Sequence, residues 1–417
     1  MRKFFNFKVS GKDIISHPLF SGSMVMIVGS NIANLMAYFY HVIMGRMLGP
    51  GSYGELSAVI SIIAIILSIF NFLGIVIVKF VSSSDKDELK SLFAWLTNKA
   101  LIASSLLAIL LLILTPFLSR FLHTEIKILV LIIPITVFGI YSFVYRAFLQ
   151  GLLKFKEFVY SLNSDFFTRL FLGLILVYLG LSTFGAVVAI TMAFFVSFLF
   201  SRKYLGDFAA RSVKKFSKQN ELFKYSAPVL VSSLAVNSML SVDVILVKHF
   251  LESHQAGIYA SLATLGKIIF YGASPVSWVM FPMVSKSEQK GGNYKKIFVM
   301  SLFLTLAIAM GVNLIYLLFP EISIKMLYGV KYLEGKVYLF LFGIYMAIFT
   351  LSSLFLNYFL SRNKTKVVYF ALIASVIQIV GIWYYHENIR SVISVSILAS
   401  AIFLILIFGY FLAERKK

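Results

Sequence analysis

The sequence of 417 residues contains no cysteine, so it can form no disulfide bond and no metal site that depends on thiolate ligands. It is also poor in charge, because only 13% of its residues are Asp, Glu, Lys or Arg, whereas 60% are hydrophobic. A water-soluble domain of this length cannot bury so much apolar surface. The composition therefore predicts a membrane protein.

Acidic residues are scarce: 17 Asp and Glu stand against 38 Lys and Arg, which gives a formal net charge of +21. A charge of this sign can also indicate nucleic-acid binding, so its distribution along the chain decides the interpretation. A bilayer-spanning helix needs about 20 mostly apolar residues. Such runs begin near residues 20, 57, 99, 126, 158, 183, 225, 256, 297, 336, 367 and 391. They predict an all-α polytopic membrane protein with about twelve transmembrane helices.

The basic residues concentrate on one side of the expected membrane. With the N-terminus in the cytoplasm, the inward segments carry 28 Lys and Arg, including Arg146, and the outward segments carry 8. Arg169 and Lys267 remain inside spans, and 28 + 8 + 2 accounts for all 38. An excess of positive charge is typical of cytoplasmic loops. We therefore expect a protein of the cytoplasmic (inner) membrane with both termini in the cytoplasm and no nucleic-acid partner.

The two halves of the chain share a pattern. A shift of 203 residues pairs Asn34 with Asn237 and Gly54 with Gly257. Six spans in each half keep the same orientation, as in transporters whose substrate path lies between two parallel repeats. We therefore expect two pseudo-symmetric six-helix bundles around a central cleft. Their predicted bounds are 1–205 for the N-terminal bundle, 206–224 for a basic cytoplasmic linker and 225–417 for the C-terminal bundle.

Two stretches at equivalent places carry a family resemblance. The first outer turn reads GRMLGPGSYGELS over residues 45–57, and SVDVILVKHFLESHQAGIYASLA follows over residues 241–263. These stretches resemble the polysaccharide transporter family, the O-antigen and lipid-linked oligosaccharide flippases of the multidrug/oligosaccharidyl-lipid/polysaccharide exporter superfamily. FPMVS at 281–285 and MLYGVKYLEG at 326–335 fit later positions of this family. The resemblance implies two bundles facing each other in a V, with helices 1, 2, 7 and 8 lining the cleft.

The expected helices 1 and 7 carry polar residues on one face. Asn31, Asn34, Tyr38 and His41 recur at spacings of three, four and seven, which places them on one side of a helix. Asn237 has a similar place in helix 7. Amides and small residues also pack membrane helices against one another, which is the alternative interpretation. A substrate that bears sugars needs a wall of hydrogen-bonding groups, so we expect these side chains to contact it.

Lys267 lies near the middle of an apolar span, where a charged side chain costs about 2.5–3.5 kcal/mol on insertion scales. Its own helix face carries the small or polar Thr264 and Tyr271. The sequence thus favours a cation that binds the phosphate of a lipid-linked substrate, with Arg46 acting nearer the outer mouth. The alternative is a structural ion pair between Lys267 and a buried carboxylate such as Asp243.

Two carboxylates fall within the expected spans. In the related lipid II flippases, a helix-7 aspartate belongs to a sodium site completed by helices 11 and 12. The resemblance therefore implies ion coupling at Asp243, with Gln378 and Ser396 on those helices, although a second acid is missing and a proton fits as well as sodium. Asp165 precedes Arg169 by four residues, which favours an intrahelical ion pair, with a proton-linked switch as the alternative. No other cofactor is expected.

These features predict a flippase that moves a polyprenyl-linked glycan outward by alternating access, with membrane lipids and other glycan assembly proteins as partners. One alternative is a multidrug exporter of organic cations, but such a cleft needs carboxylates, and the expected cleft is rich in cations and amides. Another is a membrane glycosyltransferase or polymerase, for which Asp85–Lys86–Asp87 offers only a short D-x-D match. The longest outward segment, roughly residues 319–335, is too small for such an enzyme, so we expect no enzyme. No nucleotide-binding motif is present, so we expect no direct use of ATP.

Overall fold

The structure is a computed structural model that describes residues 18–208, 219–289 and 292–415, and every regular element within these ranges is helical. The N-terminal half consists of α2 (Pro18–Ser83), α3 (Lys86–Leu122), α4 (Ile126–Val130), α5 (Ile132–Gly151), α6 (Phe155–Leu176), η1 (Val177–Leu181), α7 (Ser182–Lys203) and η2 (Gly206–Phe208). The C-terminal half consists of α8 (Gln219–Phe250), α9 (Ser253–Gln289), α10 (Tyr294–Leu318), α11 (Pro320–Leu327), η3 (Val330–Gly335), α12 (Lys336–Ser361), η4 (Thr365–Val367), α13 (Val368–Tyr384) and α14 (Ile389–Arg415). The predicted linker falls largely on residues 209–218, outside the described ranges.

The number of membrane crossings follows from two glycines. The described ranges contain ten helical stretches that are long and apolar enough to cross a membrane. Two of these stretches, of 43 and 49 residues, are twice the length that one crossing needs. Each is broken by a glycine in the left-handed region, Gly49 with φ 73° and Gly180 with φ 87°, where other residues are strained. Ten stretches and two additional crossings give twelve, as the sequence predicts.

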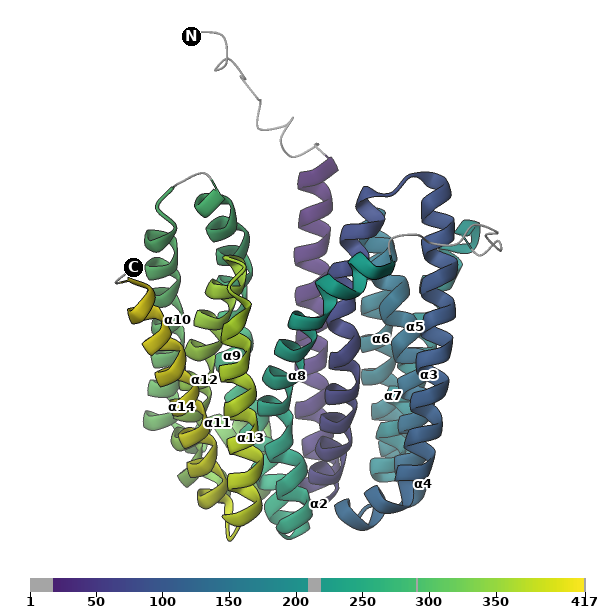
Figure 1. The fold of residues 1–417 in the computed structure, drawn as a ribbon. Coiled ribbons are helices and arrows are strands. Elements are labelled where there is room, and N and C mark those ends of the chain that lie inside the picture. The colour runs from purple at the N-terminus through teal and green to yellow at the C-terminus, as the bar shows by residue number, and fades with distance from the viewer. Residues whose placement is uncertain (1–17, 209–218, 290–291, 416–417) are drawn as a thin grey trace.

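The helices form two groups that stand side by side (Figure 1). In the N-terminal half α2 packs against α5 and α6, and α6 packs against α7. In the C-terminal half α9 and α14 pack against α12, and α13 packs against α8 and α14. The two groups meet chiefly where α2 contacts α8 and α9, which are the expected helices 1, 2, 7 and 8. The two-bundle architecture is therefore confirmed.

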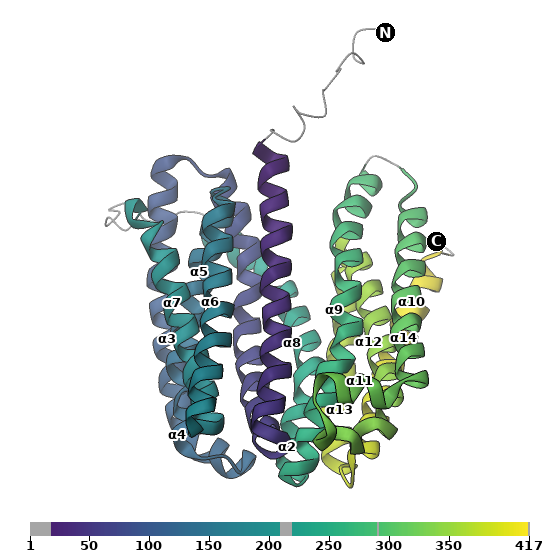
Figure 2. The same cartoon turned by 180° about the vertical axis from the view of Figure 1, so that it is seen from behind.

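The two halves converge at one end. Figures 1 and 2 show them leaning together at the bottom, where α2 reverses direction, and standing apart at the top, where α2 begins. At the convergent end a Cβ added to Gly54 would lie 2.7 Å from the backbone nitrogen of Gly257, and one added to Gly257 would collide with the backbone of Pro50. Gly54 and Gly257 are equivalent in the sequence repeat, so equivalent positions of the two halves meet at this end.

Candidate functional site

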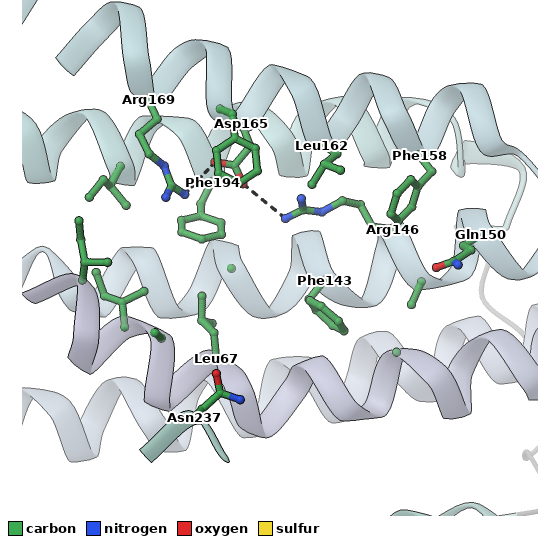
Figure 3. A pocket seen from close by; sticks show the side chains of 18 of the residues that line it. Leu67, Phe143, Arg146, Gln150, Phe158, Leu162, Asp165, Arg169, Phe194 and Asn237 are labelled. Carbon is green, nitrogen blue, oxygen red and sulfur yellow. Dashed lines mark hydrogen bonds and ion pairs between the residues drawn. The ribbon is translucent and has the colours of Figure 1, made fainter. Parts of the chain in front are cut away.

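A cavity of about 680 Å³ is lined mainly by α2, α5, α6 and α7 of the N-terminal half, and α8 and α9 of the C-terminal half contribute one lining residue each. Most of its lining is apolar and includes Leu67, Phe143 and Phe194 (Figure 3). Asn237 on α8 and Tyr271 on α9 are the lining residues that come from the C-terminal half. The predicted position of Asn237 on a cleft wall thus agrees with the structure.

Three charged side chains in the cavity wall form one cluster. The Asp165 carboxylate on α6 accepts a hydrogen bond from Nη2 of Arg169 at 2.9 Å, so the expected intrahelical ion pair is present. The other Asp165 oxygen lies 3.5 Å from Nη2 of Arg146 on α5 (Figure 3). The side chains are only 3%, 15% and 11% exposed, respectively. Two guanidinium groups around one carboxylate leave a buried excess of one positive charge.

Arg146 is a residue whose place the sequence analysis misjudged. The charge count assigned it to an inward segment, whereas α5 continues to Gly151 and buries Arg146 within its last turns. The signal lay in its neighbours, because FVYRAFL over residues 143–149 has three apolar or aromatic residues on each side of the arginine. Such flanks are unusual in a solvated loop and indicate a buried guanidinium that needs a partner.

Lys267 on α9 is half-buried and precedes Tyr271 by one helical turn, so both share a helix face. In the described part of the chain Lys267 forms no hydrogen bond and no ion pair, with Asp243 or any other carboxylate. It is nevertheless close enough to His41 and Asp243 for their charges to interact electrostatically. Arg169 is also close enough to His41 for an electrostatic interaction. His41 is therefore within electrostatic range of one cation from each half.

Arg46 bridges the two halves at their convergent end. Its Nε donates a hydrogen bond to the carbonyl oxygen of Leu327 at 2.8 Å, and its Nη2 donates to the carbonyl oxygen of Met326. These carbonyls end α11, where a cation is favourable because the helix dipole is negative there. Nearby, the Tyr53 hydroxyl shares a hydrogen bond with that of Tyr328 at 3.1 Å. The structure thus places Arg46 in a contact between bundles, where we expected it to act on substrate.

The other polar residues predicted on the first crossing differ in their exposure. Asn31 and Asn34 are exposed on α2, and neither belongs to the lining of the cavity. Tyr38 is half-buried, and its hydroxyl oxygen has no hydrogen-bond partner among the described residues. Their predicted role as substrate contacts stays a prediction.

Asp243 lies deep within the C-terminal bundle, where only 1% of the residue is exposed. Its carboxylate accepts hydrogen bonds from the Tyr259 hydroxyl at 2.8 Å and from the backbone N–H of Val244 at 2.9 Å. The Tyr259 ring comes from α9, so this bond ties α8 to its neighbour. The carboxylate therefore faces the interior of the bundle and not the cavity, whose lining does not include it.

Gln378 and Ser396 lie in the same buried region. The Gln378 side chain on α13 donates hydrogen bonds to Ser396 at 3.1 Å and to the hydroxyl of Tyr345 at 3.2 Å. That hydroxyl donates in turn to the carbonyl oxygen of Met239, one turn before Asp243. The Oε1 atom of Gln378 has no partner among the residues that the structure describes. The arrangement offers a carboxylate and an unused amide oxygen. Both are oxygen ligands that suit sodium, and the carboxylate can also bind a proton.

The fold is shared with solved membrane transporters. An inward-facing multidrug resistance MATE family transporter of the MOP superfamily aligns with a TM-score of 0.76 and 13% identity, over 92% of this chain and 96% of that one. The lipid II flippase MurJ in an inward closed conformation aligns with a TM-score of 0.72 and 16% identity, over 93% of this chain and 87% of that one. A MOP superfamily transporter from Pyrococcus furiosus aligns with a TM-score of 0.60 and 13% identity, over 96% of each chain. Its binding pocket is described as reversed in polarity. The chain therefore has the fold of MOP-superfamily transporters.

The family follows from the sequence. Residues 19–288 match the family described as polysaccharide biosynthesis protein, and the chain belongs to this family. An uncharacterized membrane protein of Methanocaldococcus jannaschii is 25% identical over 369 residues, which cover 81% of this chain and 82% of the relative. Membership of the family confirms the resemblance that residues 45–57 and 241–263 indicate.

Proposed function

We propose that this protein is a flippase that moves a lipid-linked oligosaccharide, a glycan on polyprenyl phosphate or diphosphate, from the cytoplasmic to the outer leaflet. The observation that carries the proposal is the cavity in the N-terminal half, closed on one side by Asn237 and Tyr271 of the other half, whose walls are mostly apolar and whose buried charge is net positive. A lipid-linked glycan has both an apolar chain and an anionic linkage. The cavity therefore offers a complementary environment to each part.

The electrostatics support this substrate over a neutral one. An anion that crosses a membrane loses its hydration, and its interaction with a fixed cation grows as the local dielectric constant falls. Guanidinium groups bind phosphate through paired hydrogen bonds, whereas an ammonium group acts as a compact point charge that can follow a moving phosphate. We infer that Arg146 and Arg169 in one half and Lys267 in the other bind the phosphate of the substrate during transport.

The same cavity argues against export of organic cations. Asp165 is the carboxylate among its lining residues, and both of its oxygens face arginines. A cationic drug would therefore meet a net positive wall. The D-x-D stretch of the glycosyltransferase alternative begins at Asp85, which precedes the first turn of α3 and is not a lining residue.

A flipping assay with purified protein in liposomes tests the function. A polyprenyl-diphosphate oligosaccharide should reach the outer leaflet, where a membrane-impermeant glycosidase can cleave it, only when the protein is present. A fluorescent organic cation should not be transported by the same liposomes. Transport of the cation without movement of the glycolipid would overturn the assignment and favour a multidrug exporter.

We also propose that transport is coupled to a cation at Asp243. The Asp243 carboxylate and the free Oε1 of Gln378 would hold a bound sodium ion, and the carboxylate alone would hold a proton. A bound cation would supply the charge that makes transport depend on an ion gradient. The support is the burial of Asp243 together with the unused amide oxygen in the same region.

Replacing Asp243 with Asn should leave a folded protein that binds substrate but no longer responds to an ion gradient. The amide keeps the size of the carboxylate but cannot carry its charge. The rate of flipping should therefore be the same with and without a sodium or proton gradient, whereas the wild type responds to one of them. Glu252→Gln, in the exposed turn before α9, is the matched control. Gradient-driven transport at the wild-type rate in Asp243→Asn would leave Asp243 with a structural role only.

We infer further that both termini lie in the cytoplasm and that the convergent end faces outward. Because the chain has no cysteine, single cysteines can be introduced without other changes. In intact cells a membrane-impermeant thiol reagent should label Ser182→Cys and Ser253→Cys, which are exposed at the convergent end, but not Ser287→Cys. The opposite labelling pattern would invert the orientation.

A further inference from the structure

The Arg146–Asp165–Arg169 cluster does more than join two helices. We propose that Arg146 and Arg169 form a binding site for the phosphate of an anionic lipid, and that Asp165 is an internal counter-ion which occupies the site until that phosphate displaces it. The identity of the lipid rests on the function proposed above. The site itself rests on the geometry of the three side chains and of the cavity around them.

Arg169 has an unused donor in a fixed position. Its Nη2 donates to Asp165, but its Nε is buried and has no hydrogen-bond partner in the described residues. The guanidinium lies over the rings of Phe166 and Phe194, with centroids 5.0 and 5.4 Å away, which restrains its plane. A buried N–H without an acceptor is unfavourable. The cluster is therefore short of an acceptor oxygen.

Arg146 approaches the same carboxylate from another helix and only loosely. Its Nε donates to the carbonyl oxygen of Ser142 at 3.3 Å, and its Nη2 stands 3.5 Å from Asp165. The Asp165 carboxylate thus directs one oxygen toward each guanidinium group. Only the contact with Arg169 is close. A phosphate has more acceptor oxygens than a carboxylate and forms stronger, paired bonds to guanidinium. In place of the carboxylate it would offer oxygens to both arginines, including one for the Arg169 Nε that has no acceptor in the described residues.

The walls indicate which phosphate fits. The side chains around the cluster include Phe143, Phe158, Leu162 and Phe194, and all of them line the cavity (Figure 3). A free phosphate would leave this apolar surface uncovered, whereas a phosphate carried on a hydrocarbon chain covers it. We therefore assign the site to a lipid phosphate or diphosphate and not to the inorganic ion.

The counter-ion has a consequence for the transport cycle. After the lipid leaves, two buried arginines without an anion would carry two uncompensated charges, which is strongly unfavourable. Asp165 can then pair with them again, so the empty protein can return to its inward-facing conformation without unpaired buried charges. Without the carboxylate, the arginines should hold the lipid phosphate more tightly and release it more slowly.

The test measures binding of farnesyl diphosphate to the purified full-length protein by calorimetry, with farnesol and inorganic pyrophosphate as comparison ligands. Farnesyl diphosphate should bind, and both comparison ligands should bind at least ~10-fold more weakly, since one lacks the charge and the other the apolar chain. Arg146→Gln and Arg169→Gln should each weaken binding of farnesyl diphosphate by ~10-fold or more, and Asp165→Asn should strengthen it by ~10-fold. Arg202→Gln, an exposed arginine at the end of α7, should bind like the wild type.

Several outcomes would overturn the site. They are wild-type affinity in a folded Arg169→Gln protein, unchanged or weaker affinity in a folded Asp165→Asn protein, and equal binding of pyrophosphate and farnesyl diphosphate. If Asp165→Asn does not fold, Arg169→Lys decides, because it keeps the charge and should bind more tightly than Arg169→Gln. Arginine-dependent binding without glycolipid flipping would refute the proposed function and leave this site standing. Flipping without arginine-dependent binding would refute the site alone.

Discussion

Gly257→Ala should nearly abolish transport, because the added methyl group prevents the two halves from closing at their convergent end. A Cβ at this position would overlap the backbone of Pro50, which cannot move aside as a flexible side chain can. Overpacking of a tight contact costs about 1–3 kcal/mol. A cost of this size that falls on one of two conformations shifts their ratio by roughly 5-fold to 150-fold. The variant should therefore accumulate with its convergent end open.

Spin labels at Ser182→Cys and Ser253→Cys, one in each half, measure this change as a longer distance between the labels. Gly311→Ala on α10 is the matched control, because a Cβ there would meet open space. Its transport rate and label distance should equal those of the wild type. If Gly257→Ala matched this control in both measurements, the contact between Gly54 and Gly257 would not be the closing point of the cycle.

The second large effect concerns Lys267. Lys267→Ala and Lys267→Gln should abolish flipping without loss of expression, whereas Lys267→Arg should keep part of it. The reason is that Lys267 makes no hydrogen bond or ion pair in the described part of the chain although it is half-buried in a span. A charge kept there at a cost of about 2.5–3.5 kcal/mol indicates a role outside the resting structure. We propose that this role is contact with the phosphate during transport.

The competing explanation is a structural interaction with Asp243, whose charge Lys267 senses. It predicts that Lys267→Ala is unstable and that Asp243→Asn restores its stability. Thermal unfolding and binding of a polyprenyl diphosphate by the purified variants separate the two explanations. Lys286→Gln, exposed near the end of the same helix, is the control for loss of a positive charge. A stable Lys267→Ala protein with wild-type affinity would exclude Lys267 from the phosphate path.

Local features were the most predictable from the sequence. The turn at Gly49 follows from the run Gly49–Pro50–Gly51, because adjacent glycine and proline residues favour a turn over a continuing helix. The Asp165–Arg169 pair follows from a spacing of four residues on one helix. Helix length is set by the thickness of the bilayer, so twelve crossings could be counted before the packing was known. In each case the physical cause lies within a few residues of the feature.

Features that depend on packing could not be predicted. Arg146 joins the cluster from another helix, and the carbonyl groups that Arg46 contacts lie about 280 residues away in sequence. The repeat equates Gly54 with Gly257, but it does not indicate that the two touch. Asp243, Gln378 and Ser396 were named together only through the family resemblance, because nothing in their spacing brings three separate helices into one region. Such contacts are decided by how the two bundles pack.

The central claim is that the cavity binds the anionic linkage of its substrate. Its most direct test is a comparison of two glycolipids in the same liposomes. Both carry one glycan and one polyprenyl chain, but one has a diphosphate linkage and the other a neutral ether. The wild-type protein should flip the diphosphate lipid at least ~10-fold faster, as expected for charge-assisted bonds to guanidinium. The difference should disappear in the Arg146→Gln, Arg169→Gln double variant. Equal rates for the two glycolipids in the wild type would contradict a cavity that recognises the phosphate.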